Sequence, residues 1–87
     1  MTVRLSARGE RDLRRLDHQV RRRIVAGLQA LDFAAANLDI KPIKGSPPWF
    51  RLRVGEHRVL YRSIENGFLV ERIVSRQDLE KGVRTLE

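Results

Sequence analysis

Residues 49–74 read WFRLRVGEHRVLYRSIENGFLVERIV, and this stretch decides the fold. Apolar and polar side chains alternate through three short segments, which is typical of strands with one buried face. Gly55-Glu56 suits a tight turn after the first segment, and Asn66-Gly67 is a strong hairpin signal after the second. The sequence therefore predicts an antiparallel meander of three strands, at residues 49–54, 57–64 and 68–74.

The N-terminal part of the chain predicts a short strand followed by helical structure. Residues 2–5 alternate and include a β-branched Val3, and Ser6 is a good N-cap for a helix. Apolar residues then recur at spacings of three and four, as on one face of a helix: Leu13, Leu16, Val20, Ile24, Leu28 and Leu31. We expect a hairpin of two helices, in which Asp17 caps a second helix that runs to Ala36. One continuous amphipathic helix fits the same spacing.

The remaining segments complete an α+β class. Residues 40–48 hold all three prolines and a glycine, so we expect a loop there. Residues 76–86 carry apolar side chains at helical spacing and predict a short C-terminal helix. We expect the N-terminal strand to join a small antiparallel sheet and the helices to cover one face of it. Residues 1–87 are expected to form a single domain, because a chain of this length builds one core.

Composition limits the classes of function. Lys and Arg total 18 against 11 Asp and Glu, which gives a net charge of +7 and predicts a polyanionic partner such as nucleic acid. There is no cysteine, and His18 and His57 lie in different segments without carboxylates at ligand spacing, so we expect no metal and no cofactor. Neither a signal-peptide pattern nor an apolar run of membrane-spanning length is present, which indicates a cytoplasmic protein.

Arginines gather where the sheet is predicted to begin. Strand alternation places Arg51 and Arg53 on the same face as Trp49, and the tight turn brings Arg58 and Arg62 of the next strand to that face. A single arginine there suits a solvated cover on apolar sheet surface. Four cations that converge on one open face repel each other unless an anion lies between them, and a bound phosphate supplies that anion. Trp49 is either a core residue or a surface on which an RNA base stacks.

The chain resembles the RelE/ParE superfamily of bacterial toxins. The resemblance lies in Ile43-Lys44-Gly45, in residues 51–62, in Ile73 to Arg76, and in the order of the predicted elements. It implies a toxin of a type II toxin–antitoxin system. The RelE-like branch, which we favour, implies a ribosome-dependent mRNA endonuclease that inhibits translation and cuts RNA without metal, by attack of a 2′-OH on its own phosphorus. The implied partners are a RelB-like antitoxin, the ribosome and messenger RNA.

The resemblance also implies catalytic residues, which in this sequence are Arg51, Arg53, Arg58 and Arg76. Guanidinium groups suit the stabilisation of a crowded, negatively charged phosphorane. We expect Arg58 and Arg76 to carry that role, and Arg51 and Arg53 to position the RNA backbone. The residues expected to bind RNA from the same basic region are Lys41, Lys44, Trp49 and Arg62.

The sequence departs from the family pattern at the groups that transfer protons. Many members have a His-Arg pair followed by Tyr, whereas this chain has Ser75-Arg76 and then Leu79-Glu80. His57 and Glu80 are the candidates to replace the missing groups, although alternation turns His57 away from Arg58. Two other functions therefore remain open: a ParE-like inhibitor of DNA gyrase, and a catalytically weak member that acts by binding its antitoxin.

Overall fold

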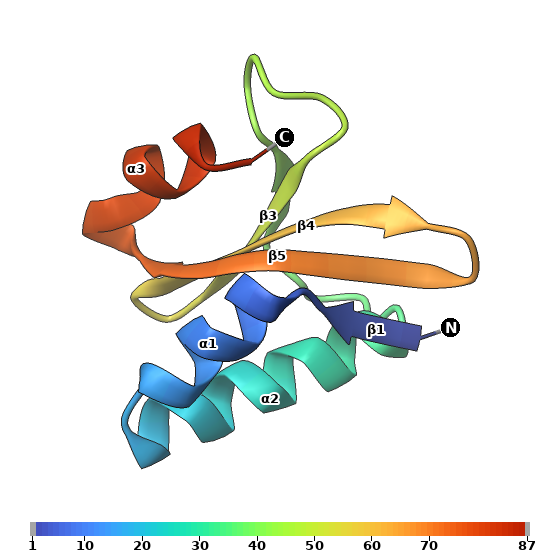
Figure 1. The fold of residues 1–87 in the computed structure, drawn as a ribbon. Helices are drawn as coiled ribbons and strands as arrows, with labels where there is room; N and C mark the ends of the chain where they lie inside the picture. The colour runs from blue at the N-terminus through green and yellow to red at the C-terminus, as the bar shows by residue number, and fades with distance from the viewer. Residues whose placement is uncertain (1, 87) are drawn as a thin grey trace.

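The computed structural model describes residues 2–86 and has the predicted α+β class (Figure 1). The elements in chain order are β1 (Thr2–Leu5), α1 (Ala7–Arg15), α2 (His18–Asp32), β2 (Ile40–Pro42), β3 (Phe50–Val54), β4 (His57–Ile64), β5 (Gly67–Ser75), a 3₁₀ turn η1 (Arg76–Asp78) and α3 (Leu79–Arg84). The five strands form one sheet in the order β1-β5-β4-β3-β2. The sequence-based meander of β3, β4 and β5 is confirmed at the centre of this sheet.

The first strand joins the sheet as expected, and it does so in a parallel pairing with β5. Beyond Val70, β1 no longer covers the edge of β5, and α1 takes its place. The Ser6 N–H donates to the Val70 carbonyl at 2.9 Å, and the Ile73 N–H donates to Asp12 Oδ2 at 2.9 Å. Asp12 Oδ2 also accepts from Arg72 Nε at 2.8 Å. The carboxylate therefore satisfies part of a strand edge that would otherwise be open to pairing with another chain.

The expectation of a loop throughout residues 40–48 is wrong, because residues Ile40–Pro42 form the edge strand β2 and pair with β3. An edge strand tolerates proline, since a residue without an N–H is harmless where no neighbour needs that donor. The Ile43 N–H continues the contact by donating to the Trp49 carbonyl at 3.0 Å. This short strand widens the sheet beside the arginines of β3.

The predicted helical hairpin is confirmed, and both of its caps are formed. Ser6 Oγ accepts from the Gly9 N–H and Asp17 Oδ1 accepts from the Val20 N–H, each at 3.0 Å. The second helix ends at Asp32 and not at Ala36, because Ala34 adopts a left-handed conformation with φ of 55°. No helix within residues 2–86 is both long enough and apolar enough to cross a membrane.

The helices lie on both faces of the sheet, which corrects the expectation that they cover one face (Figure 1). The core lies between α2 and the sheet and contains Ile24, Leu28, Leu31, Leu52, Val59, Tyr61, Val70 and Ile73. On the other face α3 packs on Leu60 and Val74. A Cβ atom at Gly82 would lie 3.0 Å from Val74 Cγ1 and 3.2 Å from Leu60 Cδ1, so the missing side chain is what allows this close approach. A six-residue helix carries too little pattern to reveal this placement in advance.

Candidate nucleic-acid interface

Strand register brings the predicted basic residues to the face of the sheet on which α3 packs. Arg53 is the direct partner of Arg58, and Lys41 is the direct partner of Arg51. Direct partners point to the same side of a sheet. We call this side, with Arg76 where the chain leaves β5, the arginine face: Lys41, Arg51, Arg53, Arg58 and Arg76.

Arg58 is buried, which corrects the expectation that all these arginines lie on an open surface. Its exposed fraction is only 9%. Its Nη1 donates to the carbonyls of Gly55 and His57, at 3.1 and 3.0 Å. The neighbouring Val74, its partner on β5, lies under α3. Arg58 thus folds back over the β3–β4 turn in place of extending into solvent.

The surroundings of Arg58 disfavour its positive charge, which lowers its pKa. Burial lowers this pKa, and the charges of Arg53, Arg51 and Arg76 lower it further, while Glu56 acts in the opposite direction. A lowered pKa for a cation means that its surroundings disfavour the charge. An anion bound among these guanidinium groups removes that penalty, so the arginine face is suited to a phosphate.

Two carboxylates lie at the margin of the arginine face. Arg53 Nη1 is 3.9 Å from Asp39 Oδ2, and Arg76 Nη1 is 3.6 Å from Glu56 Oε1. Both pairs are well exposed, and such pairs stabilise a fold by at most about 1 kcal/mol. The Arg76 N–H also donates to the Glu56 carbonyl at 2.7 Å, which fixes Arg76 beside the turn. The sequence indicated only that Glu56 lies in a tight turn, so its carboxylate was not predicted to be part of the site.

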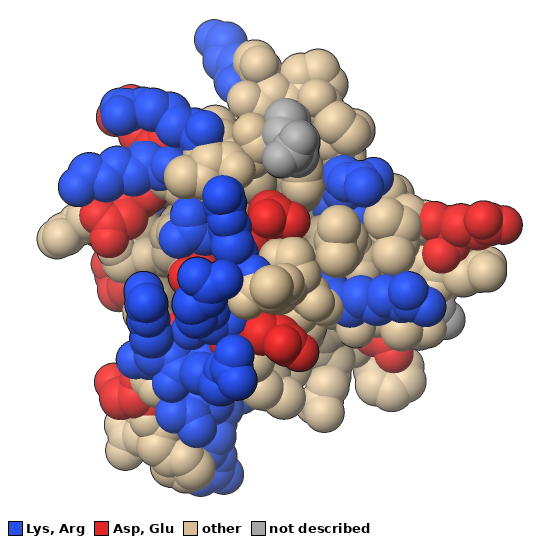
Figure 2. All heavy atoms as spheres, in the orientation of Figure 1, with Lys and Arg blue, Asp and Glu red and all other residues tan. Residues whose placement is uncertain are grey.

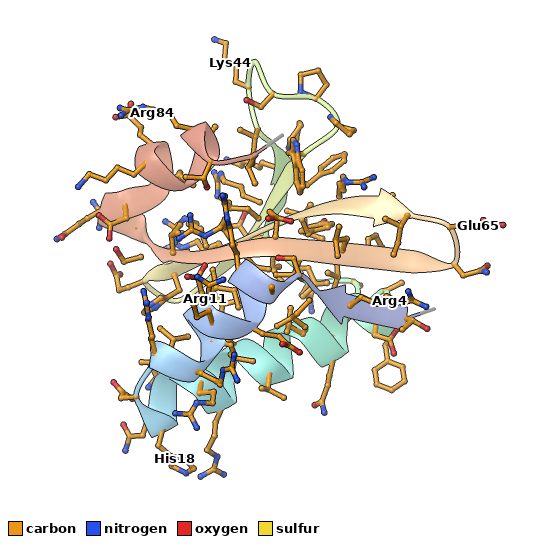
Figure 3. The ribbon with its side chains drawn as sticks, in the orientation of Figure 1. Arg4, Arg11, His18, Lys44, Glu65 and Arg84 are labelled. Atoms are coloured by element: carbon orange, nitrogen blue, oxygen red, sulfur yellow. The ribbon has the colours of Figure 1, made fainter. Side chains whose placement is uncertain are left out.

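The residues predicted to bind RNA fall in different places. Lys41 is exposed on β2 beside Arg51. Trp49 is only 3% exposed, and the guanidinium carbon of Arg62 lies 5.8 Å from the centre of its ring. The tryptophan is therefore a buried residue with a cation over it, and this arrangement offers no open ring for a base. Lys44 stands at the tip of the loop before β3 and points away from the sheet (Figure 3).

His57, one of the two candidates for proton transfer, lies away from the arginine face. His57 is half-buried and is the partner of Val54, on the side of the sheet opposite to Arg58. Tyr61 is buried on that same side, where it packs against Phe50 and Phe68, and burial raises its pKa. Glu80 is exposed in the first turn of α3. Among the described residues, the only carboxylates paired with the arginine face are Asp39 and Glu56.

The five-stranded sheet and the arginine face define a small basic α+β domain suited to a polyanionic partner. The family model of the ParE toxin of the type II toxin–antitoxin system parDE matches residues 3–80, so the chain belongs to this family. No curated protein matches the chain.

Solved structures of RelE toxins share the fold. The RelB–RelE antitoxin–toxin complex of Methanococcus jannaschii matches with a TM-score of 0.75 and 22% identity, over 91% of this chain and 96% of that one. The RelBE2 complex of Mycobacterium tuberculosis matches with a TM-score of 0.70 and 25% identity, over 86% and 96%. The isolated E. coli RelE toxin matches with a TM-score of 0.64 and 17% identity, over 97% of both chains. The predicted membership of the RelE/ParE superfamily is confirmed.

Proposed function

We propose that this toxin binds messenger RNA in the ribosome through its arginine face and cleaves it. The observation that carries the proposal is the convergence of arginines on Arg58: Arg53 is its direct cross-strand partner, and the charges of Arg53, Arg51 and Arg76 add to burial in lowering its pKa. Guanidinium groups that are already positioned around a phosphate stabilise phosphorane charge without having to reorganise.

The proposed reaction uses the chain, the RNA and water. The 2′ oxygen attacks the adjacent phosphorus as it loses its proton, the bond from phosphorus to the 5′ oxygen breaks, and a 2′,3′-cyclic phosphate forms. The leaving 5′ oxygen takes a proton from water. Arg51 and Arg53 hold the backbone, while Arg58 and Arg76 stabilise the charge that develops on phosphorus. Arginine stays protonated, so it does not accept the 2′ proton.

Glu56 is the group that we assign as proton acceptor. Its carboxylate lies 3.6 Å from Arg76 and raises the pKa of Arg58 by its charge, so it borders the site where phosphate would bind. A carboxylate has several lone pairs, so one that forms a single ion pair can still accept a proton. Glu80 on α3 remains the alternative acceptor, whereas the placement of His57 on the opposite side of the sheet argues against that residue.

Inhibition of DNA gyrase by binding alone is the second candidate. Two observations favour it: the family model that matches is that of the ParE toxin, and the arginine face as defined within residues 2–86 contains neither His nor Tyr. The same surface would then bind an acidic target without chemistry. A catalytically weak toxin that acts by binding its antitoxin also fits this second class.

An antitoxin encoded with the toxin is the proposed protein partner. Three similar structures are toxin–antitoxin complexes: two pair RelE with RelB, and the third is the complex named RelBE2. In this chain a mostly apolar groove between β1 and α2 is lined by Val3, Leu5, Val25, Leu28, Gln29 and Asp32. Phe33, which caps the end of α2, is 81% exposed. A segment that folds on binding would cover such a groove with apolar side chains and neutralise the basic surface with acidic ones.

A reconstituted assay separates the two functions. The purified chain is added to ribosomes programmed with a defined message, and cuts are located by primer extension; gyrase supercoiling is measured in parallel. We expect cleavage by the wild type and a loss of about 100-fold or more for the Arg51→Gln/Arg53→Gln variant. The Arg22→Gln/Arg23→Gln variant, which removes the same charge from exposed positions of α2, should cut normally. An intact message together with blocked supercoiling would contradict the nuclease function and support inhibition of gyrase.

A further inference from the structure

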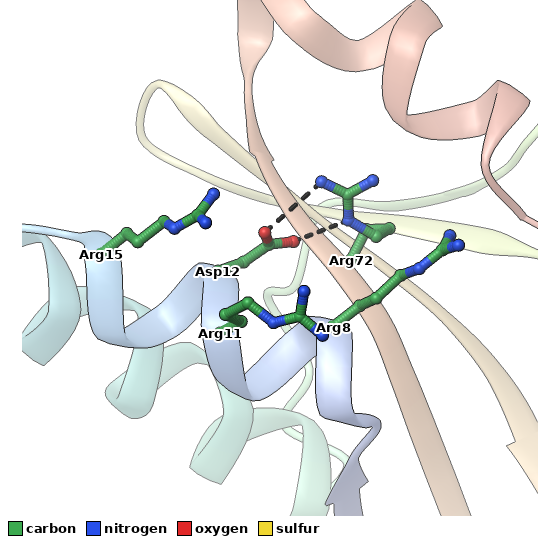
Figure 4. Close-up of a pocket in the computed structure, with 5 residues that line it drawn as sticks. All are labelled: Arg8, Arg11, Asp12, Arg15 and Arg72. Carbon is green, nitrogen blue, oxygen red and sulfur yellow. Dashed lines mark hydrogen bonds and ion pairs between the residues drawn. The ribbon is translucent and has the colours of Figure 1, made fainter.

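A second group of arginines lies on α1, away from the arginine face. Arg8, Arg11, Arg15 and Arg72 surround Asp12 in a surface pocket of about 200 Å³ (Figure 4). Three of these residues belong to one side of a single helix, at spacings of three and four, and Arg72 comes from β5. In the view of Figure 2, Lys and Arg side chains gather densely over α1.

The base of this pocket is rigid. Asp12 accepts from Arg72 Nε at 2.8 Å and from Arg72 Nη2 at 3.4 Å, and Thr85 Oγ1 accepts from Arg72 Nη1 at 2.8 Å. The side chains of Asp12 and Arg72 are only 11% and 21% exposed. Arg72 uses three of its five N–H groups in these bonds and keeps two for a ligand.

The arginines at the rim of the pocket have few hydrogen-bond partners inside the protein. Arg11 and Arg15 are exposed and make no hydrogen bond or ion pair within residues 2–86, and Arg8 makes one bond, to the Thr85 carbonyl at 3.0 Å. Like charges three and four residues apart on a helix destabilise it. The single negative charge of Asp12 is already balanced by its ion pair with Arg72. The rim arginines therefore keep an excess of positive charge, and a bound anion would reduce the repulsion between them.

The pocket is separate from the arginine face. The row of direct partners across the sheet runs from Arg51 through Leu60 to Arg72, and Leu60 is fully buried under α3. The arginine face and the α1 pocket therefore lie on either side of α3. An extended polyanion has room to contact one, the other, or both.

We propose that the α1 pocket binds the phosphodiester backbone of a nucleic acid. The lining consists of arginine and one aspartate, with no apolar residue to anchor a peptide. Protein interfaces rely on buried apolar and aromatic anchors, whereas backbone phosphates are bound through charge and forked guanidinium bonds. Such contacts fix the position of the toxin on its target without reading sequence. This binding does not depend on whether the arginine face performs cleavage.

Fluorescence anisotropy with a labelled RNA hairpin and a labelled DNA duplex tests this proposal across a salt series. The Arg11→Gln/Arg15→Gln variant removes two exposed charges that make no hydrogen bond or ion pair within residues 2–86, so we expect the fold to be retained. We expect about 10-fold weaker binding and a salt dependence that is shallower by one to two phosphate contacts. The Arg22→Gln/Arg23→Gln variant removes equal charge from α2 and should lose less than about 2-fold.

The two probes distinguish the sources of phosphate. A loss with both probes, with RNA alone or with DNA alone supports the site and names the nucleic acid that it binds. An equal loss of affinity in the α1 and α2 variants would mean that only the net charge of the protein matters. That result would overturn the proposal. Binding of a poly-glutamate peptide that depends on Arg11 and Arg15, with unchanged nucleic-acid binding, would also overturn it. The Arg51→Gln/Arg53→Gln variant should retain the part of binding that depends on α1, which keeps this test independent of the proposed cleavage.

Discussion

Arg53 of β3 and Arg58 of β4 face each other as direct cross-strand partners, yet one is exposed and the other is buried. Like charges placed opposite each other in a sheet repel. The pair is accommodated because the Arg58 guanidinium turns back to two carbonyls of the β3–β4 turn while Arg53 extends toward Asp39. Arg53 is therefore the more accessible to a ligand, and Arg58 is held rigidly beside it.

Truncation of Arg58 should destabilise the fold. Arg58→Ala removes a buried stem and two hydrogen bonds, so we expect a loss of about 1–3 kcal/mol in the free energy of unfolding, measured by urea denaturation with Trp49 fluorescence. Arg58→Met keeps the stem and removes a charge that its surroundings disfavour, so it should cost less than half as much. An Arg58→Ala variant as stable as the wild type would mean that Arg58 is solvated, as the sequence alone suggested.

Loss of the Asp12 carboxylate should be more costly than loss of an exposed acid. Asp12→Ala leaves the Arg72 guanidinium and the Ile73 N–H without their shared acceptor, and we expect a cost of about 2–4 kcal/mol in unfolding free energy. Asp39→Ala breaks only the exposed pair with Arg53 and should cost less than about 0.5 kcal/mol. Equal effects in the two variants would show that α1 does not depend on Asp12 to hold the edge of β5.

Burial of Tyr61 predicts a specific loss of stability in alkali. Its pKa is raised in the folded state, so the unfolded chain releases the phenol proton first as pH rises through the ordinary value of about 10. The contribution of the buried, neutral phenol to the free energy of unfolding is fully present below about pH 10. It is lost as pH rises toward the pKa of Tyr61 in the folded protein. Because the chain has one tyrosine, tyrosinate absorbance reports Tyr61 alone. Ionisation with an ordinary midpoint in the folded protein would contradict this burial.

Removal of Arg62 should expose the single tryptophan. The guanidinium over the Trp49 ring is expected to stabilise the fold by about 0.5–1 kcal/mol and to shield the indole. Arg62→Ala should therefore shift Trp49 emission to longer wavelength and increase quenching by acrylamide. The control Arg4→Ala changes an exposed residue of β1 and should leave emission unchanged. An unchanged spectrum in Arg62→Ala would show that other residues cover the ring.

Local signals in the sequence predicted much of the fold. Asn66-Gly67 and Gly55-Glu56 set the register of the meander, and that register alone places Arg51, Arg53 and Arg58 on one face. Ser6 and Asp17 predicted both helix starts through their capping side chains. These features depend on residues within a few positions of each other.

Local signals of this kind did not predict contacts between segments that lie far apart in the sequence. Asp12 and Arg72 are sixty residues apart, so no spacing rule joins them. Which face α3 covers depends on the fit of Gly82 against Leu60 and Val74, and no local pattern revealed that Arg58 is buried. Strand β2 was missed because three residues with a proline at the end resemble a loop.

Cleavage by the arginine face is tested most directly by mapping new mRNA 5′ ends in bacteria that express this toxin without an antitoxin. We expect cuts confined to translated regions, with the periodicity of codons. These cuts should disappear in the Arg51→Gln/Arg53→Gln variant but not in Arg22→Gln/Arg23→Gln. Growth arrest with intact messages would contradict cleavage by the arginine face and would favour gyrase or another bound target.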